Sequence, residues 1–311
     1  VLVCPHNVID YVDGKPKQVA KATAAFDFCG ISEGIGCDVC AQVCPRLNPR
    51  EFELVDLLYG PDQPYKGAFG VYRRIVAARC LAPEIMERAQ DGGVVTAMLR
   101  WAFERGVIDG AAVSVADPGR PARPMPKLVT SAEELLASAG SWYTYCPNNL
   151  ALADAERLGL ERVAFVGVPC QITPVRKMQF VDVGYLENGR KKDKHIERQS
   201  KFLKGYGARV ALNIGLLCTE VFTYEGLMVD KIQNEMGIRL GDIKKFNVKG
   251  KILIYKKDGS MVEMKLKTAQ EYARPECHHC GDFSAELADI SCGGVGAMDW
   301  TITILRTERG E

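Results

Sequence analysis

The sequence has almost no net charge and no apolar run long enough to cross a membrane. Its 40 Lys and Arg residues against 39 Asp and Glu residues leave a formal net charge of +1, so nothing attracts it overall to nucleic acid or to an anionic membrane. The longest apolar stretches, such as residues 163–168 and 211–217, fall far short of the roughly 20 residues of a membrane span. Internal repeats and low-complexity tracts are also lacking, and we expect no secretory signal. We therefore expect a cytoplasmic protein that binds no nucleic acid and touches membranes only through partner subunits.

Cysteine, by contrast, is abundant, with 12 in 311 residues. Close pairs such as Cys37/Cys40 and Cys277/Cys280 suit a shared metal or cluster better than long-range disulfides, which are rare in a reducing compartment. A chain of this length can form two or three compact units. The sequence therefore predicts a multi-part protein with metal or cluster sites.

Turn residues and composition separate a short front segment from a longer body. Residues 1–66 are turn-rich and cysteine-dense, with a hairpin predicted at Asp13-Gly14 between residues 8–11 and 18–20. Pro and Gly are then frequent in residues 60–70, which is typical of a linker. From Gly70 onward strands and helices alternate, so the body is predicted to be of the α/β class.

Within the body, hydrophobic periodicity predicts individual elements. A helix is expected over residues 94–105, because Gly92 and Gly93 precede the apolar stripe and Gly106 can end it. Short β-branched runs predict buried strands over residues 107–114, 162–168 and 209–217. Residues 251–256 and 261–266, joined through Asp258-Gly259, predict a second hairpin.

The strongest local pattern lies in the front segment, where five cysteines are closely spaced: Cys4, Cys29, Cys37, Cys40 and Cys44. Its end matches the ferredoxin run C-x2-C-x2-C-x3-C-P, in which the cysteine before proline binds the neighbouring cluster. On that logic Cys44 serves a second cluster whose other ligands precede Val1, and the other four cysteines hold one [4Fe-4S] cluster. A four-cysteine zinc site is the alternative that similar spacing allows.

A second set of cysteines falls in the body. Cys170 follows the predicted strand 162–168 and Cys218 follows the strand 209–217. Two parallel strands would place both thiols at one carboxyl edge, where α/β sheets bind ligands. Cys277 and Cys280 add two thiolates at a spacing that lets one turn bind one site. The spacing leaves two interpretations open: four ligands of another [4Fe-4S] cluster, or Cys170 and Cys218 as small buried apolar residues.

Three further cysteines carry less information. Cys80 lies in an apolar stretch and is predicted to be in the core. Cys146 and Cys292 lie beside turn residues near the expected site, and either support it or are inert.

Two loops have the composition of a ligand pocket. Gln90, Asp91, Gly92 and Gly93 precede a predicted helix, and glycines there let an anion approach the free N–H groups of the first turn. Paired glycines before a helix are also common in plain turns. Residues 140–149 combine aromatic rings, hydroxyls and amides, as do pockets for flat heteroaromatic ligands, although a polar turn with core aromatics has the same composition. The basic residues 190–204 form a solvated surface or steer an anionic carrier.

Taken in order along the chain, six segments resemble the coenzyme F420 hydrogenase/dehydrogenase beta-subunit family: AQDGG (89–93), GSWYT (140–144), GVPCQ (167–171), IGLLC (214–218), CHHC (277–280) and ADIS (288–291). Together these segments are specific, and the resemblance covers nearly the whole chain. The cysteine-rich front segment is similar to that of F420H2 dehydrogenase input subunits and of some formate dehydrogenase beta subunits, rather than to the shorter hydrogenase subunit.

The resemblance implies a ferredoxin-like unit over residues 1–66, an FAD-binding part of the body over residues 67–150, and a part that carries a [4Fe-4S] cluster and the FAD/F420 site over residues 151–311. It implies that four cysteines bind the body cluster: Cys170, Cys218, Cys277 and Cys280. The residues expected at the flavin are Gln90, Asp91, Gly92, Gly93, Thr96, Gly140, Ser141, Tyr143, Thr144, Pro169 and Gln171. Cys146 and Cys292 stand where the family would have a serine-like residue.

The implied function is an iron–sulfur flavoprotein oxidoreductase that transfers electrons between coenzyme F420 and [4Fe-4S] clusters through FAD. Hydride carriers move two electrons and clusters accept one, a mismatch that a flavin bridges, so no side chain is expected to be catalytic. The implied partners are subunits of a larger complex in archaeal-type energy metabolism, of hydrogenase, formate dehydrogenase, heterodisulfide reductase or membrane dehydrogenase type. The alternatives are a ferredoxin-fed flavin and iron–sulfur reductase acting on a tetrapyrrole or on sulfite, and a zinc-bound scaffold without a redox role.

Overall fold

The computed structural model describes residues 1–5, 7–19, 37–181, 193–294, 296 and 299–311. For residues 193–195 it describes only the backbone. Cys29, one of the expected cluster ligands, lies outside the described residues. Among the described residues, none of the helices combines the length and apolar character of a bilayer-spanning segment.

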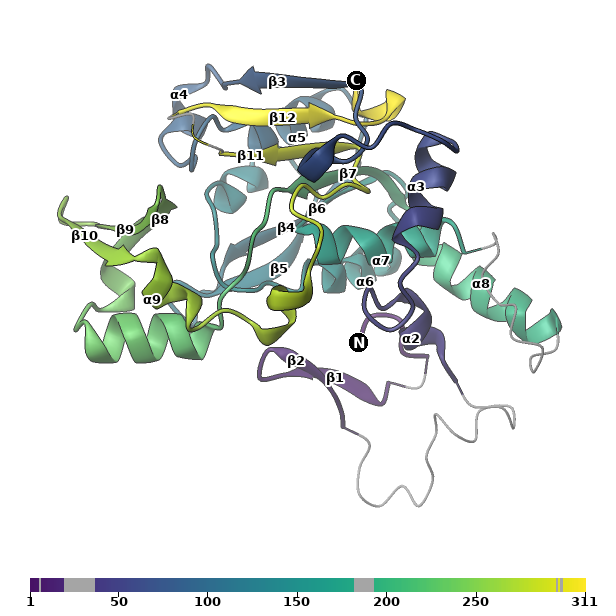
Figure 1. Cartoon of the computed structure of the whole chain (residues 1–311), viewed down its shortest axis with the longest axis horizontal. Helices are drawn as coiled ribbons and strands as arrows, with labels where there is room; N and C mark the ends of the chain where they lie inside the picture. Colours follow the sequence, from purple (N-terminus) through teal and green to yellow (C-terminus); the bar gives the residue numbers. More distant parts are fainter. Residues whose placement is uncertain (6, 20–36, 182–192, 295, 297–298) are drawn as a thin grey trace.

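A seven-stranded mixed sheet organises the body, which confirms the predicted α/β class (Figure 1). Its strands, in spatial order, are β3 (Arg74–Ala78), β12 (Thr301–Leu305), β11 (Ile290–Gly293), β7 (Val210–Leu216), β6 (Val163–Gly167), β4 (Gly110–Ala116) and β5 (Pro124–Val129). The four strands β11, β7, β6 and β4 run parallel, whereas β12, β3 and β5 pair antiparallel at the two sides. The carboxyl ends of β6 and β7 therefore meet at one edge, as predicted.

Strand β6 is apolar throughout because both faces of the sheet are covered. Its side chains alternate between two core clusters: Phe165 packs with Ile172 on one face, and Val166 packs with Ile214 and Leu99 on the other. Helices α6 (Leu152–Arg157), α7 (Pro169–Gln179) and α8 (Asp193–Gly207) pack on the first face, and α5 (Val94–Glu104) packs on the second (Figure 1).

The predicted elements of the body match the structure closely, with one displaced boundary. Helix α5 begins after Gly93, whose φ of 67° is left-handed, and ends before Gly106. The strand predicted from residue 107 begins only at Gly110, so that boundary is wrong. The N–H groups of Val107 and Ile108 both donate to the carbonyl of Ala102 and close the end of the helix instead.

The front segment forms a hairpin and two helices that pack onto the body. Strands β1 (Ile9–Val12) and β2 (Lys15–Gln18) pair antiparallel across Asp13-Gly14, both at positive φ, which confirms the predicted turn and hairpin. The second strand was predicted over residues 18–20 and begins at Lys15 instead, because the two-residue turn leads directly into it. Helices α2 (Val39–Val43) and α3 (Glu51–Tyr59) follow. Val39 and Leu54 are buried in the same cluster as Phe165. The front segment therefore shares a hydrophobic cluster with the body.

A separate three-stranded sheet lies at one end of the molecule (Figure 1). It contains β8 (Ile243–Val248), β9 (Lys251–Lys256) and β10 (Met261–Lys265), all antiparallel, so the predicted hairpin is confirmed and gains a third strand. A π-helix (Tyr224–Glu235) and α9 (Leu266–Gln270) complete its own hydrophobic cluster. The remaining elements are short: α4 (Pro83–Met86) and the 3₁₀ turns Gly67–Phe69, Glu134–Ser138, Asn148–Ala151, Leu240–Asp242, Pro275–His279 and Glu308–Gly310.

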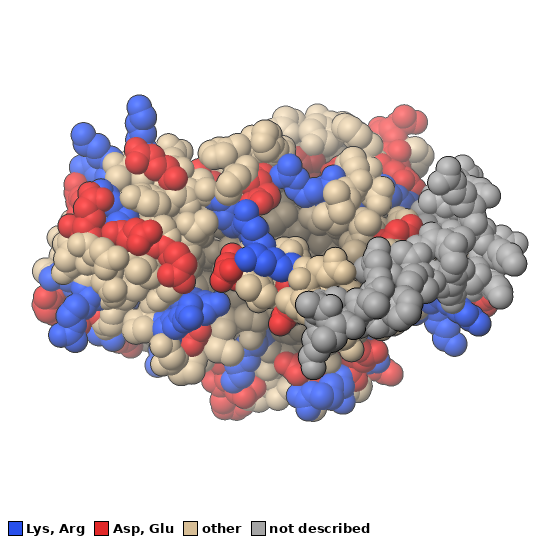
Figure 2. Space-filling model, turned by 90° about the horizontal axis from the view of Figure 1, so that it is seen from below, with Lys and Arg blue, Asp and Glu red and all other residues tan. Residues whose placement is uncertain are grey.

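The surface carries charges of both signs. Figure 2 shows acidic and basic side chains interspersed over one face of the molecule. This distribution agrees with the net charge of +1.

Candidate functional site

A cavity of about 450 Å³ lies at the carboxyl ends of the central strands, within the size range of small-molecule sites. Its floor comes from the residues at the end of β6, from residues 216–222 at and after the end of β7, and from residues 292–294 at the end of β11. Ligands of α/β proteins bind at this edge of the sheet. The cavity therefore lies where the topology predicts a site.

The loop before α5 forms one wall of the cavity. Gln90, Asp91 and Gly93 line it, and so do the first residues of α5, so the positive end of the helix dipole faces the cavity. Gly92 has a different role, because its N–H donates to Thr301 Oγ1 (3.1 Å) and a Cβ there would lie 2.6 Å from the carbonyl oxygen of Ala78. Gly92 thus packs the loop against β3 and β12.

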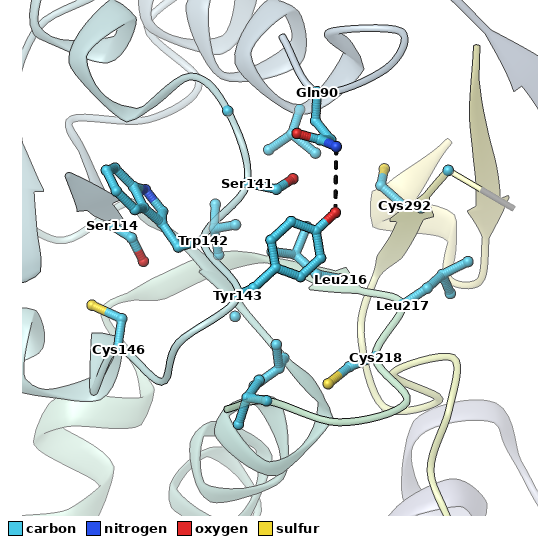
Figure 3. Close-up of a pocket in the computed structure, with 18 of the residues that line it drawn as sticks. Gln90, Ser114, Ser141, Trp142, Tyr143, Cys146, Leu216, Leu217, Cys218 and Cys292 are labelled. Carbon is cyan, nitrogen blue, oxygen red and sulfur yellow. Dashed lines mark hydrogen bonds between the residues drawn. The ribbon is translucent and has the colours of Figure 1, made fainter. Parts of the chain in front are cut away.

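Residues 140–146 form the facing wall, with two aromatic rings in view (Figure 3). Gln90 Nε2 donates to the Tyr143 hydroxyl (3.3 Å), which joins the two walls. Burial raises the pKa of Tyr143 to about 12, and the nearby Asp91 carboxylate contributes to this rise. The phenol therefore stays protonated and can donate a hydrogen bond at neutral pH.

Two buried polar atoms of this wall have no hydrogen-bond partner in the described structure: Trp142 Nε1 and Thr144 Oγ1. Both residues line the cavity, and Thr144 is only 3% exposed. A buried polar group without a partner costs about 1–3 kcal/mol. A flat ligand with polar edge atoms would relieve this cost, so the residues present fit a heteroaromatic ring such as a flavin.

Four thiols gather beside the cavity. Cys170 lies in the first turn of α7, Cys218 follows β7, and Cys277 and Cys280 lie in and after the turn Pro275–His279. Desolvation by the surrounding residues raises the pKa of the Cys170 thiol to about 12, although Cys170 is an exposed residue, and Cys280 and Cys277 contribute to this rise. Burial also raises the pKa of Cys218, with Cys170, Cys277 and Cys280 adding to the rise.

These mutual effects place the four thiols within electrostatic range of one another. Four adjacent thiolates are costly without a cation between them, and a thiolate-only set is the usual donor set of an iron–sulfur cluster. Among the residues that the structure describes, no three His, Cys, Asp or Glu side chains are close enough to hold a single metal ion. A cubane binds its thiolates through four separate iron atoms, so its ligands are spaced more widely than those of one ion.

Cys218 belongs to both parts of the site, since it also lines the cavity (Figure 3). Cys146 and Cys292 line the cavity as well and are buried. Cys80, predicted to be in the core, is only partly buried. That prediction is wrong because Cys80 lies just beyond the outer strand β3 of the sheet.

In the front segment, the structure brings Cys4, Cys37 and Cys40 together. Burial raises the pKa of Cys37, and the neighbouring Cys40 and Cys4 raise it further. Cys44 lies elsewhere, against α7: its carbonyl oxygen accepts a hydrogen bond from Lys177 Nζ (2.6 Å).

Two contacts fasten the end of the front cysteine pattern to the thiol-bearing elements of the body. Lys177 is fully buried, donates also to the Asn48 carbonyl, and lies on α7, which carries Cys170. Arg46 Nη1 donates to the carbonyl of Glu276 (2.9 Å), the residue before Cys277. These hydrogen bonds hold the Cys44 segment beside the body thiols.

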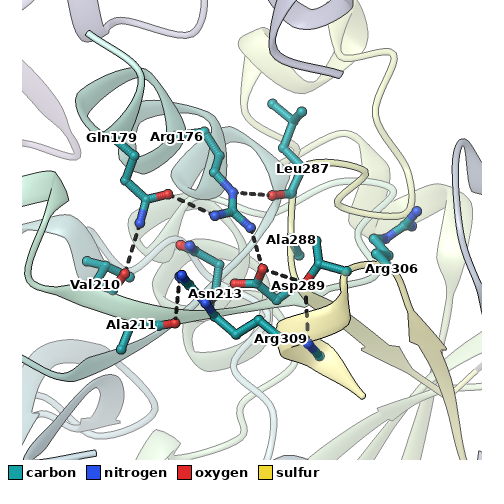
Figure 4. Close-up of polar contacts among 12 residues, drawn as sticks. Arg176, Gln179, Val210, Ala211, Asn213, Leu287, Ala288, Asp289, Arg306 and Arg309 are labelled. Carbon is teal, nitrogen blue, oxygen red and sulfur yellow. Dashed lines mark hydrogen bonds and ion pairs between the residues drawn. The ribbon is translucent and has the colours of Figure 1, made fainter. Parts of the chain in front are cut away.

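A buried polar network fixes the elements that carry the body thiols (Figure 4). Arg176 on α7 forms an ion pair with Asp289 (2.9 Å), and both side chains are 3% exposed. Asp289 Oδ2 accepts a hydrogen bond from the N–H of Asn213 on β7 (2.8 Å). The network therefore links the helix of Cys170, the strand before Cys218 and the segment that follows Cys280.

Most of the residues that the sequence predicted at a flavin line the cavity: Gln90, Asp91, Gly93, Thr96, Gly140, Ser141, Tyr143, Thr144 and Gln171. Gly92 and Pro169 are not part of the lining. Sequence reasoning missed the contribution of Asn247 and Val248, which come from β8. No local pattern in the sequence indicates that this hairpin reaches the cavity.

An aromatic-lined cavity that shares a cysteine with a group of four thiols, at the carboxyl edge of a mixed α/β sheet, is the arrangement of a redox protein. The chain belongs to the coenzyme F420 hydrogenase/dehydrogenase beta-subunit family: the model of the family's N-terminal part matches residues 75–153, and that of its C-terminal part matches residues 160–311.

Known relatives cover most or all of the chain. It is 38% identical over 246 residues to the coenzyme F420 hydrogenase subunit beta of Methanococcus voltae, covering 78% of this chain and 80% of that protein. It is 34% identical to the coenzyme F420-dependent sulfite reductase of Methanocaldococcus jannaschii, covering 100% of this chain and 43% of that protein. A chain of the F420-reducing [NiFe] hydrogenase complex from Methanosarcina barkeri has a similar structure, with a TM-score of 0.69, 32% identity, and coverage of 80% of this chain and 79% of that one.

Proposed function

We propose that this chain is the F420-reactive subunit of a larger redox complex and transfers electrons between coenzyme F420 and [4Fe-4S] clusters through FAD. The observation that carries the proposal is the position of Cys218, which lines the ligand cavity and also belongs to the four-thiol group. A redox ligand in the cavity would thus lie next to a cluster held by these thiols. The family membership and the two F420-named relatives support the identity of the carrier.

The chain's own residues would bind and orient the flavin. The residues proposed to hold it are those predicted from the sequence that line the cavity, together with Trp142, whose Nε1 has no other hydrogen-bond partner in the described structure. Tyr143 stays neutral and offers a hydroxyl donor. When bound, FAD supplies the exchange between two-electron hydride transfer and one-electron transfer.

The thiols would hold the clusters. Cys170, Cys218, Cys277 and Cys280 are the proposed ligands beside the cavity, and Cys4, Cys29, Cys37 and Cys40 those of the front cluster, with Cys44 serving another. The Arg46 and Lys177 hydrogen bonds hold the Cys44 segment against the body, so the front unit, residues 1–66, is proposed to exchange electrons with partner subunits. The body is also proposed to divide at about residue 150, and the matches of the two family models to residues 75–153 and 160–311 support this boundary.

Oxidation of reduced F420 by the anoxically purified chain tests the proposal. With an artificial one-electron acceptor present, we expect the violet absorbance of oxidised F420 to appear, and Cys218→Ser to abolish it. Cys80→Ser, which changes a thiol outside both parts of the site, is the matched control. Absence of F420 turnover by flavin-loaded protein, with electrons accepted from reduced ferredoxin instead, would favour a ferredoxin-fed reductase. The sulfite reductase relative makes sulfite the first alternative substrate to assay.

A further inference from the structure

The cavity is lined by acidic but not by basic side chains. Asp91 and Glu220 belong to its described lining, which contains no Lys, Arg or His. A ligand that carries phosphate therefore needs a cation from the cavity rim. Lys249 lies there, in the turn between β8 and β9 and directly after the lining residue Val248.

Three separate elements meet at the Lys249 ammonium group. Its Nζ lies 3.1 Å from Asp91 Oδ1, in the loop before α5, and 3.5 Å from the carbonyl oxygen of Gly294, after β11. The pair is largely shielded, with the two side chains 20% and 12% exposed. A Cβ on Gly294 would collide with Asp91 Oδ2, so the absence of a side chain there lets the carboxylate approach. The ammonium is thus held at a fixed point of the rim.

We propose that Lys249 is the residue that binds the phosphate of a flavin-type ligand at this rim. An ammonium group has three hydrogens, and the two acceptors that the structure shows leave one for a ligand. The pairing with Asp91 also neutralises a carboxylate that would otherwise repel a phosphate. The first turn of α5 lines the same wall and adds its N–H groups and positive dipole end. Lys249 therefore determines the preference for phosphorylated over unphosphorylated ligands.

This inference rests on the proposed function and refines it, because it names the group of the ligand that is recognised. The phosphate has two sources. It belongs either to the resident flavin nucleotide or to the tail of the deazaflavin carrier. Both molecules carry a phosphate ester on a side chain attached to a flat tricyclic ring. Two pairs of probes separate them.

The first pair is riboflavin and FMN, which share one ring system and differ in one phosphate. Their dissociation constants are measured by quenching of flavin fluorescence on flavin-free full-length protein. We expect wild type to bind FMN at least about tenfold more tightly than riboflavin, as one charge-assisted hydrogen bond allows. Lys249→Met should bring the two constants close together with little change for riboflavin, whereas Lys249→Arg should retain the preference.

Lys251→Met is the matched control, because it removes the same charge from the same hairpin at a residue that pairs with Glu263 on β10. It should leave the FMN preference unchanged.

The second pair is coenzyme F420 and its deazaflavin core without the phosphate-bearing tail, bound to flavin-loaded protein. If Lys249→Met loses the preference for F420 over its core but keeps the preference for FMN over riboflavin, the Lys249 site binds the phosphate of the carrier.

The outcomes separate the two proposals. If Lys249→Met weakens riboflavin and FMN equally and leaves the deazaflavin pair unaffected, Lys249 only ties the hairpin to the loop. The inference is then overturned while the flavin function stands. If the protein binds neither flavin nor deazaflavin, the proposed function fails and the phosphate site fails with it.

Discussion

Replacing Asp289 by asparagine removes the charge at the centre of the buried network while keeping the shape of the side chain. In the native chain both carboxylate oxygens are engaged: Oδ1 accepts from Thr307 Oγ1 (2.7 Å) and pairs with Arg176 (2.9 Å), and Oδ2 accepts from the Asn213 N–H (2.8 Å). The substituted amide would present an NH2 group in place of one oxygen, and this donor would then face another donor. Arg176 would keep a buried charge without its counter-ion.

We expect Asp289→Asn to lower the free energy of unfolding by about 3–5 kcal/mol, the usual cost of removing one partner of a buried ion pair. This is a large part of the roughly 5–15 kcal/mol that stabilises a typical domain. The double variant Arg176→Met/Asp289→Asn should lose less than the sum of the two single variants, by about 0.5–3 kcal/mol, because it leaves no unpaired charge.

Urea unfolding under anoxic conditions measures these differences. The midpoint should fall in Asp289→Asn with an unchanged slope, and the double variant should recover part of the shift. A loss below about 1 kcal/mol, or strict additivity of the two substitutions, would mean that this pair is not a buried, coupled ion pair. Because the network links the elements that carry Cys170 and Cys218, the single variant should also bind less iron at temperatures where it remains folded.

Three further substitutions probe the site and its surroundings. Cys218→Ser should lose the iron and the broad visible absorption of the proposed body cluster, while Cys80→Ser should keep both, as metal analysis and absorption spectra will show. Lys177→Met removes the donor from the carbonyls of Cys44 and Asn48, both partly buried residues, and each lost hydrogen bond to the charged amine costs about 1.5–3 kcal/mol; limited proteolysis should cut the front segment faster than in wild type, and an equal rate would argue against this attachment. Burial raises the pKa of Glu286 above its ordinary 4.5, so the native state binds more protons than the unfolded state above that pH, and the free energy of unfolding should fall as pH rises through the folded-state pKa. Glu286→Gln should flatten this part of the stability profile, and an identical profile in the two proteins would rule out Glu286 as its source.

The central strands were predictable because their sequences leave little choice. Residues 163–167 are apolar, residues 210–216 are apolar apart from Asn213, and both runs contain β-branched residues and are bounded by turn signals, so burial on both faces of a sheet is the arrangement that satisfies them. Parallel pairing then fixes Cys170 and Cys218 at one edge. The Asp13-Gly14 turn was equally direct, because both residues tolerate the positive φ that a two-residue hairpin needs.

Features that depend on long-range contacts were not predictable. Strand β8 has two adjacent lysines and an asparagine among its apolar residues and therefore no strong signal by itself, yet β9 pairs with it and it reaches the cavity. The partnership of Lys249 with Asp91 joins residues 158 positions apart, and nothing local to either residue indicates it. The displaced start of β4 has a local cause instead, since residues 107 and 108 complete the turn after α5.

Whether the chain is an iron–sulfur flavoprotein is decided by its content of iron, acid-labile sulfide, zinc and flavin after anoxic purification. We expect iron and sulfide in equal amounts, about four of each per cluster, together with about one FAD per chain. Zinc bound to the cysteines, with neither flavin nor sulfide, would instead identify a scaffold without a redox role.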